Sequence, residues 1–147
     1  MKSIFHIFIL FLIVSNGFAE HPETEWQLLI ERVNHCIKMN EKDSALINLK
    51  KALNLAETNY AADHPLVIKS LDLLGYFCWK EGKYPCAELY LKRALETEEN
   101  APEPNQGRLA DILKMLGLVY EAQQRFQLAE SCYQRTLSVL QKVPGHM

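Results

Sequence analysis

The chain has 147 residues, with 16 Lys or Arg and 18 Asp or Glu, which gives a formal net charge of −2 at neutral pH. This near balance excludes the strongly basic surface by which a domain binds nucleic acid through charge. The apolar content of 48% is ordinary for a folded domain, so a disordered or low-complexity chain is excluded as well.

Residues 1–19 have the pattern of a secretory signal peptide. Lys2 supplies the positive start, residues 4–14 are an apolar run, and Gly17-Phe18-Ala19 has the small-x-small pattern of a cleavage site. The run is shorter than the about 20 residues that span a membrane, and no Cys follows Ala19 as a lipid anchor would need. We therefore expect a periplasmic or secreted protein with no membrane span after cleavage; an uncleaved anchor is the alternative.

The remaining residues suffice for one modest core and not for two domains. We expect a helical domain over residues 20–143, with repeats at about 23–60, 64–99 and 105–143, and a flexible tail at 144–147. In the first repeat we expect a helix over 25–39, a turn with Asp43 as N-cap, and a second helix that ends near Thr58.

The second repeat follows a loop that ends in Asp63, the expected N-cap, and has Pro65 in the first helical turn. Apolar or small residues then recur at the 3.6-residue helical period. The first stripe is Val67, Leu71, Leu74, Gly75 and Cys78, and the second is Ala87, Leu91, Ala94 and Leu95. Gly82 suits the left-handed end of the first helix, and the small Gly75 and Ala87 let the two helices approach closely.

The third repeat is found by aligning Leu113 with Leu71, which places Leu116, Gly117 and Tyr120 over the rest of the first stripe. Phe126, Ala129 and Leu137 fall over Tyr84, Ala87 and Leu95 in the same alignment. The opposite shift brings Leu29, Cys36, Ala45, Leu49, Ala52 and Leu53 onto the same stripes. Three copies at a constant period predict an all-α solenoid of three helix–turn–helix repeats, about six helices.

The repeated segments resemble the tetratricopeptide repeat family, and in particular the 42-residue repeats of the kinesin-light-chain type. The resemblance lies in GKYPCAELYLKRAL, in AQQRFQLAESCYQRTL and in the entry motif Asp63-His64-Pro65. It covers roughly residues 23–143. The first copy departs from the pattern at Arg32, Val33 and Lys42.

The resemblance implies a scaffold for protein–protein interaction, which binds a peptide or helix in a concave groove lined by the first helix of each pair. The positions that match the groove are Asn34, Lys38, Lys69, Asp72, Tyr76, Trp79, Lys80, Asp111, Lys114, Leu118 and Glu121. Tyr76 and Trp79 share one helical face beside lysines, a combination typical of interface hot spots. The alternative for Trp79 is ordinary packing over the end of the hairpin.

Some members of the family clamp the acidic C-terminus of cytosolic chaperones with a Lys, Asn, Asn, Lys, Arg set. The matching positions here are Ile30, Asn34, Leu73, Asp111 and Met115, of which only Asn34 agrees. The sequence therefore argues against that partner.

The sixth helix is more apolar than one buried face needs, and a repeat array exposes the face of its last helix. We expect either a second copy of the chain or another subunit of an envelope complex to cover this surface. The residues of this self-association face are Tyr133, Leu137, Val139, Leu140 and Val143. The alternative is that Val139 and Leu140 pack on the fifth helix.

Four cysteines invite disulfides in an exported chain. Cys78 and Cys86 face each other across one predicted hairpin and are the candidate pair, which also leaves a thiol-active factor as a further alternative. Small cysteines buried in a helical core are the simpler interpretation.

The sequence contains no pair of His or Cys side chains at metal-ligand spacing and no nucleophile or phosphate-loop motif. We therefore assign no metal, no cofactor and no catalytic residue, and we expect carboxylates such as Asp72, Glu98 and Glu99 to lie on solvated faces. The sequence predicts a binding protein and not an enzyme.

Overall fold

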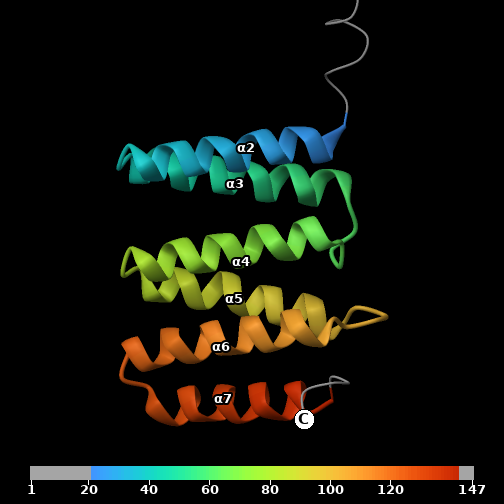
Figure 1. Ribbon diagram of the computed structural model, residues 1–147, viewed down its shortest axis with the longest axis vertical. Helices are drawn as coiled ribbons and strands as arrows, with labels where there is room; N and C mark the ends of the chain where they lie inside the picture. Colours follow the sequence, from blue (N-terminus) through green and yellow to red (C-terminus); the bar gives the residue numbers. More distant parts are fainter. Residues whose placement is uncertain (1–20, 143–147) are drawn as a thin grey trace, which may run out of the picture.

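Six helices account for the regular structure of residues 21–142, the part of the chain that the computed structural model describes. They are α2 (Pro22–Lys38), α3 (Lys42–Asn59), α4 (Pro65–Lys80), α5 (Tyr84–Glu99), α6 (Gln106–Ala122) and α7 (Phe126–Leu140). Each helix packs antiparallel to the next, and the pairs stack along the long axis of the molecule with their tight turns at one edge (Figure 1). The predicted all-α solenoid of three helix–turn–helix repeats is confirmed.

Several predictions concern residues outside the described part of the chain. They are the signal peptide at 1–19, Val143 of the self-association face and the tail at 144–147. Among residues 21–142, none of the helices is long and apolar enough to cross a membrane.

The repeat period of the sequence becomes a period of the fold. The second helices of the three pairs begin at Lys42, Tyr84 and Phe126, which are equally spaced along the chain. The first helix begins at Pro22 and not near Glu25, because a proline occupies the first helical turn without losing a backbone hydrogen bond.

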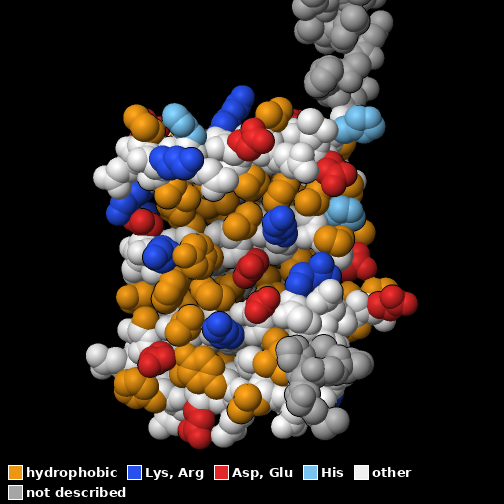
Figure 2. All heavy atoms as spheres, in the orientation of Figure 1, with side chains coloured by type: hydrophobic (Ala, Val, Ile, Leu, Met, Phe, Trp, Pro, Cys, Tyr) orange, Lys and Arg blue, Asp and Glu red, His pale blue; other side chains and the backbone are white. Residues whose placement is uncertain are grey.

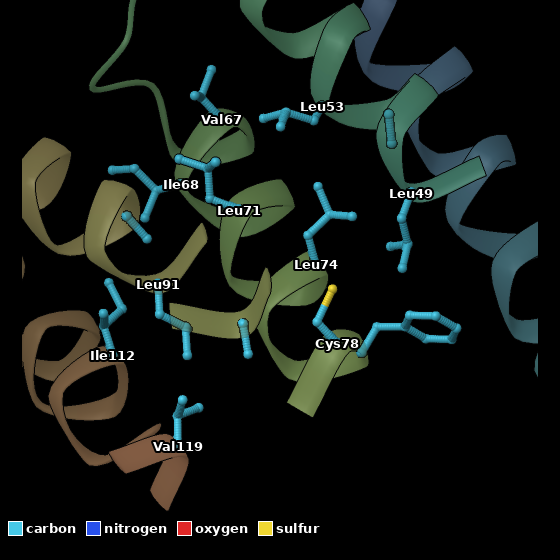
Figure 3. Packing of buried hydrophobic residues seen from close by; sticks show 14 of the residues in the cluster. Leu49, Leu53, Val67, Ile68, Leu71, Leu74, Cys78, Leu91, Ile112 and Val119 are labelled. Carbon is cyan, nitrogen blue, oxygen red and sulfur yellow. The ribbon is translucent and has the colours of Figure 1, made fainter. Parts of the chain in front are cut away.

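The core is built from the apolar stripes that the sequence predicts. Figure 3 shows Leu71 and Leu74 of α4 between Leu49 and Leu53 of α3 on one side and Leu91 of α5 on the other. Leu71, Leu74 and Leu91 are fully buried. Burying one such side chain stabilises a fold by roughly 1.5–3 kcal/mol, and the third repeat adds further buried side chains of this size, among them Ile112, Leu113 and Leu116.

The two helices of the central pair meet where α4 has no side chain. A Cβ on Gly75 would lie 2.5 Å from Cγ of Leu91, closer than two carbon atoms approach without displacement. Gly117 meets the ring of Tyr133 in the same way in the third pair. The predicted close approach at Gly75 is confirmed, and the side chain nearest to the glycine is the large Leu91.

Each of the three tight turns contains one residue in the left-handed conformation. These residues are Asn40, Gly82 and Gln124, with φ of 59°, 70° and 60°. In each turn the next residue donates its N–H to a carbonyl five positions earlier, as Lys83 does to Cys78 at 2.8 Å, which closes the preceding helix. The prediction for Gly82 is confirmed, and the same geometry at Asn40 and Gln124 follows from the repeat.

The N-caps predicted at Asp43 and Asp63 are wrong. Helix α3 begins at Lys42 with Glu41 at the N-cap position, two residues earlier than predicted, so Asp43 lies in its first turn, where a carboxylate favours the helix dipole. Helix α4 is capped by His64, whose Nδ1 accepts a hydrogen bond from the Leu66 N–H at 3.2 Å. The ring of Tyr60 stacks on that of His64 with centroids 3.9 Å apart, which holds the imidazole in the capping position.

Glu98 is fully buried, which corrects the expectation of a solvated carboxylate. The guanidinium of Arg108 donates to both of its oxygens, from Nε at 2.8 Å and from Nη2 at 3.2 Å. The backbone N–H of Asn105 donates to Glu98 as well. The carboxylate thereby ties the loop between α5 and α6 to both helices, and removing it would leave the Arg108 charge without its partner.

Helix α7 does not bury all the positions that the repeat pattern assigns to the core. Phe126 and Leu137 are 61% and 63% exposed, whereas the equivalent Tyr84 and Leu95 are half-buried. The reason is that α5 packs between α4 and α6, but within residues 21–142 α7 packs on α6 at the end of the stack.

We predict opposite effects on stability for two substitutions at equivalent turn positions. Gln124→Gly should raise the free energy of unfolding by about 0.5–1 kcal/mol, because glycine adopts positive φ without a steric penalty. Gly82→Ala should lower it by about 1 kcal/mol, since nothing lies within 4 Å of the added Cβ and only the backbone penalty remains. Urea unfolding of the two variants checks this; a change of the same sign in both would contradict it.

Candidate functional site

The first helices of the three pairs share one side of the molecule, which we call the groove face. Figure 2 shows apolar side chains exposed along α2, α4 and α6, interspersed with Lys and with Asp or Glu. In each first helix, the apolar stripe that faces the second helix is buried. The residues that lie off this stripe therefore point to the groove face. Two hollows lie on this face, at the end where the tight turns are.

The first hollow has a volume of about 320 Å³ and lies between α2 and α4. Most of its wall is apolar, and the polar groups stand at its rim. Its lining residues are Ile30, Val33, Asn34, Ile37, Asn40, Lys42, Leu49, Leu73, Tyr76, Phe77, Lys80 and Glu81. An ion pair between Lys42 Nζ and Glu81 Oε2 at 2.9 Å joins the turns of the first two repeats beside it.

The second hollow has a volume of about 430 Å³ and lies between α4 and α6. It is lined by Trp79, Lys80, Tyr84, Leu118, Glu121 and Ala122. Lys80 lines both hollows, so the C-terminal end of α4 forms the ridge between them.

The aromatic pair on this ridge is partly exposed. Tyr76 is 46% exposed, and its ring centroid lies 5.9 Å from that of the half-buried Trp79. Trp79 also packs against the core cluster. Trp79 therefore both packs on the core and lines the second hollow.

Acidic groups meet in the middle of the groove face. Asp72 of α4 is half-buried, and its Oδ1 has no hydrogen-bond partner among the described residues. Burial raises the pKa of this carboxyl above its ordinary value, and the nearby charge of Asp111 on α6 raises that pKa further. This corrects the expectation that Asp72 lies on a solvated face.

One predicted groove lysine interacts with its own repeat array. The ammonium of Lys69 lies 5.3 Å from the ring centroid of Trp26, a cation–π distance. Trp26 is buried, and its Nε1 donates to Oγ of Ser70 at 2.7 Å. This contact joins the first helices of the first two repeats and is absent from the sequence-based interpretation.

The structure brings part of the predicted groove set together. Asn34, Tyr76 and Lys80 line the first hollow, and Trp79, Leu118 and Glu121 line the second with Lys80. Lys38 and Lys114 are exposed on α2 and α6 and line neither hollow.

The site prediction did not include Ile37, whose side chain lines the first hollow while 53% exposed. Its position three residues after Asn34 was the available signal, because residues three apart share a helical face.

Comparison with known proteins identifies the repeats. Residues 73–142 match the family model described as tetratricopeptide repeat. These residues belong to the tetratricopeptide repeat family. No curated protein sequence matches the chain.

Two solved structures show how far the fold extends. The chain aligns with BtubC (BKLC) from P. vanneervenii over 99% of its own length, at 20% identity and a TM-score of 0.79. It spans 57% of the length of that protein. It also aligns with the N-terminal domain of stress-induced protein-1 (STI-1) from C. elegans at 17% identity and a TM-score of 0.68, covering 86% of this chain and 91% of that one. The first repeat therefore shares the tetratricopeptide-like fold, although the sequence match begins at residue 73.

The outer side of the last tetratricopeptide repeat is apolar in part. Leu128 and Leu137 are exposed, and Val139 and Leu140 are half-buried. Tyr133, which we placed on the same face, packs its ring against Gly117. Its hydroxyl donates to Glu121 at 2.9 Å, so this side chain belongs to the contact between α6 and α7.

Residues 21–142 contain no group of three or more His, Cys, Asp or Glu side chains arranged to hold a metal ion. The polar groups on the groove face are dispersed along three helices.

We predict that Asp72→Asn stabilises the protein in a pH-dependent way. The pKa of this carboxyl is higher in the folded state than in the unfolded chain, so ionisation favours unfolding as pH rises between the two values. The variant should therefore be more stable than the natural protein at pH 7 and equally stable near about pH 3, where the carboxyl is protonated in both states. Urea unfolding at the two pH values measures this; a larger gain at low pH would contradict it.

Proposed function

We propose that the protein is an interaction module that binds a peptide segment or helix of another protein on its groove face. The observation that carries the proposal is the apolar hollow between α2 and α4, with exposed Ile37 and Tyr76 in its wall. The tetratricopeptide repeat fold, which is typical of interaction modules, supports it.

The first hollow suits an apolar anchor residue of the partner. Its volume of about 320 Å³ is at the lower end of the range for ligand sites. Ile30, Ile37 and Leu73 supply aliphatic contacts, and Tyr76 supplies a large rigid surface with little conformational entropy to lose. Filling the hollow removes apolar surface of both molecules from water, which favours binding.

Asp72 and Asp111 favour a basic residue of the partner next to its apolar anchor. The unpartnered Oδ1 of Asp72 and the nearby Asp111 favour a Lys or Arg of the partner, which would compensate the carboxylate charge. Asp72 lies one helical turn before Tyr76, about 5–6 Å along α4. In the partner, a basic residue is therefore expected two positions from the anchor if the segment is extended, or three to four positions if it is helical.

Charge on the rim sets the direction of the segment. Lys80 stands between the two hollows, and Glu121 lies at the far side of the second. An acidic residue of the partner would meet Lys80, while its basic residue faces Asp72. A surface of three short repeats is small, so we expect affinities near micromolar.

We infer binding and not catalysis as the activity. Among the described residues, the hydroxyl–carboxylate contacts of Tyr120 with Glu88 and of Tyr133 with Glu121 join neighbouring helices, and no group of three or more His, Cys, Asp or Glu side chains is arranged to hold a metal ion. The signal-like residues 1–19 support a periplasmic or secreted location. Mass measurement of the N-terminus of the protein recovered from the native cells tests this, and a protein that begins at Met1 in the cytoplasm would refute it.

We predict that peptides selected from a random display library for binding to this protein contact the ridge formed by the C-terminal end of α4. Tyr76→Ala/Trp79→Ala should weaken their binding at least tenfold, because interface aromatics of this type carry about 1.4 kcal/mol or more. Selected peptides should share an apolar residue and a Lys or Arg at the spacing given above. Fluorescence anisotropy with the purified full chain measures the affinity.

The matched control is Leu89→Ala, which removes a 64% exposed side chain from α5, a second helix. It should bind with unchanged affinity. Circular dichroism verifies that both variants keep their helical content. Equal binding by the folded double variant would refute the proposed groove.

A second candidate function is assembly through the outer side of α7, as a homodimer or as a subunit of an envelope complex. The exposure of Phe126, Leu128 and Leu137 favours it.

We predict that the protein sediments as a dimer at high micromolar concentration and that Leu137→Glu converts it to a monomer, because a charge would be buried in the contact. A monomer at that concentration would contradict the homodimer. Leu89→Glu is the matched control and should leave the dimer intact.

A further inference from the structure

We propose that Cys78 and Cys86 form a reversible disulfide that locks the turn between α4 and α5. It forms by exchange with a disulfide-containing oxidant, for which glutathione disulfide is the probe. The cross-link lies under the ridge between the two hollows, and its formation does not depend on which peptide the groove face binds.

The geometry places the two sulfur atoms together before any bond forms. Sγ of Cys78 lies 2.7 Å from Sγ of Cys86, and a disulfide has a length of about 2.05 Å. Cys78 is in the last turn of α4 and Cys86 in the first turn of α5. The two sulfur atoms are therefore already close to bonding distance in the reduced fold.

The repeat explains why only this turn carries such a pair. The equivalent positions hold Cys36 and Ser44 in the first repeat and Tyr120 and Leu128 in the third. Cys36 has a contact from Asn48 Nδ2 at 3.9 Å from its sulfur, and Cys132 is buried in α7. Cys78 and Cys86 therefore each face another thiol, and Cys36 and Cys132 serve as internal controls that do not.

The difference in burial sets the order of the reaction. Cys86 is half-buried, whereas Cys78 is fully buried. The Cys86 thiolate therefore attacks glutathione disulfide first, which gives a mixed disulfide on Cys86 and releases one glutathione thiolate. Cys78 then loses its proton to solvent and attacks Sγ of Cys86, which releases the second glutathione. The two protein thiols are oxidised, and one glutathione disulfide is reduced to two thiols.

Burial raises the pKa of Cys78 to about 12, and its contact with Cys86 adds to this shift. In the reduced protein this thiol is therefore protonated at neutral pH. A protonated thiol is a poor nucleophile, so the second step is slow and the pair is unsuited to rapid turnover. This favours a structural, redox-dependent cross-link over the thiol-active factor that the cysteines also suggested.

The cross-link would act on the part of the molecule that we propose binds the partner. It ties the C-terminal end of α4, which carries Trp79 and Lys80, to the start of α5. Closing this short loop reduces the freedom of the unfolded chain, so oxidation should raise the melting temperature by roughly 5–10 °C.

The experiment equilibrates the purified full chain in glutathione buffer at pH 7.5, followed by acid quench, denaturation and alkylation of free thiols. We expect two alkylated cysteines, Cys36 and Cys132, and a cross-linked peptide that contains Cys78 and Cys86, identified by mass spectrometry. The melting temperature should fall when dithiothreitol is added. Cys36→Ala/Cys132→Ala should retain both the cross-link and the shift.

Cys86→Ser should lose the cross-link and the redox dependence of the melting temperature while keeping the helical circular dichroism spectrum. Four alkylated thiols in the oxidised protein would overturn the proposal. A cross-link that involves Cys36 or Cys132, or a stable glutathione adduct on Cys86 without the cross-link, would overturn it equally. None of these outcomes depends on the peptide-binding experiment.

Discussion

The contact between Gly75 and Leu91 is the constraint on which the rest of the structure depends. Because residue 75 has no Cβ, the side chain of Leu91 occupies the space where that atom would lie. This fixes the separation of α4 and α5 at the centre of the array. The same separation brings the two sulfur atoms of Cys78 and Cys86 to 2.7 Å.

The three hairpins stack in a regular register, but the burial of equivalent residues differs between them. Ion pairs recur between the second helices, where Arg93 pairs with Glu57 and Arg135 pairs with Glu99 at the equivalent positions one repeat later. Such exposed pairs contribute little to stability; they show that the register of the array is regular. The burial is not regular, because α5 has neighbours on both sides whereas α7 is at the end of the described stack.

The groove face combines apolar hollows with charges that the fold does not fully compensate. Lys69 is engaged by Trp26, and Glu121 by Tyr133, but Asp72 retains a buried oxygen without a partner among the described residues. An uncompensated group of this kind costs free energy, and such costs are often found at binding sites, where a ligand supplies the missing partner. The unpartnered oxygen of Asp72 therefore lowers the stability of the array and at the same time favours binding of a basic group of the proposed partner.

The sequence alone determined the helices, the period at which they repeat and the buried stripes, because each of these depends on the local spacing of apolar residues and glycines. It also determined the left-handed Gly82 and the close approach at Gly75. It did not determine that Glu98 is buried, that His64 caps α4, or that Phe126 is exposed. Each depends on a neighbour outside the local pattern: Arg108 across a loop, the ring of Tyr60, and the lack of a further helix on α7 within residues 21–142. The tertiary structure also decided which groove residues meet, since the hollows form between consecutive pairs and the distance between those pairs is set by packing.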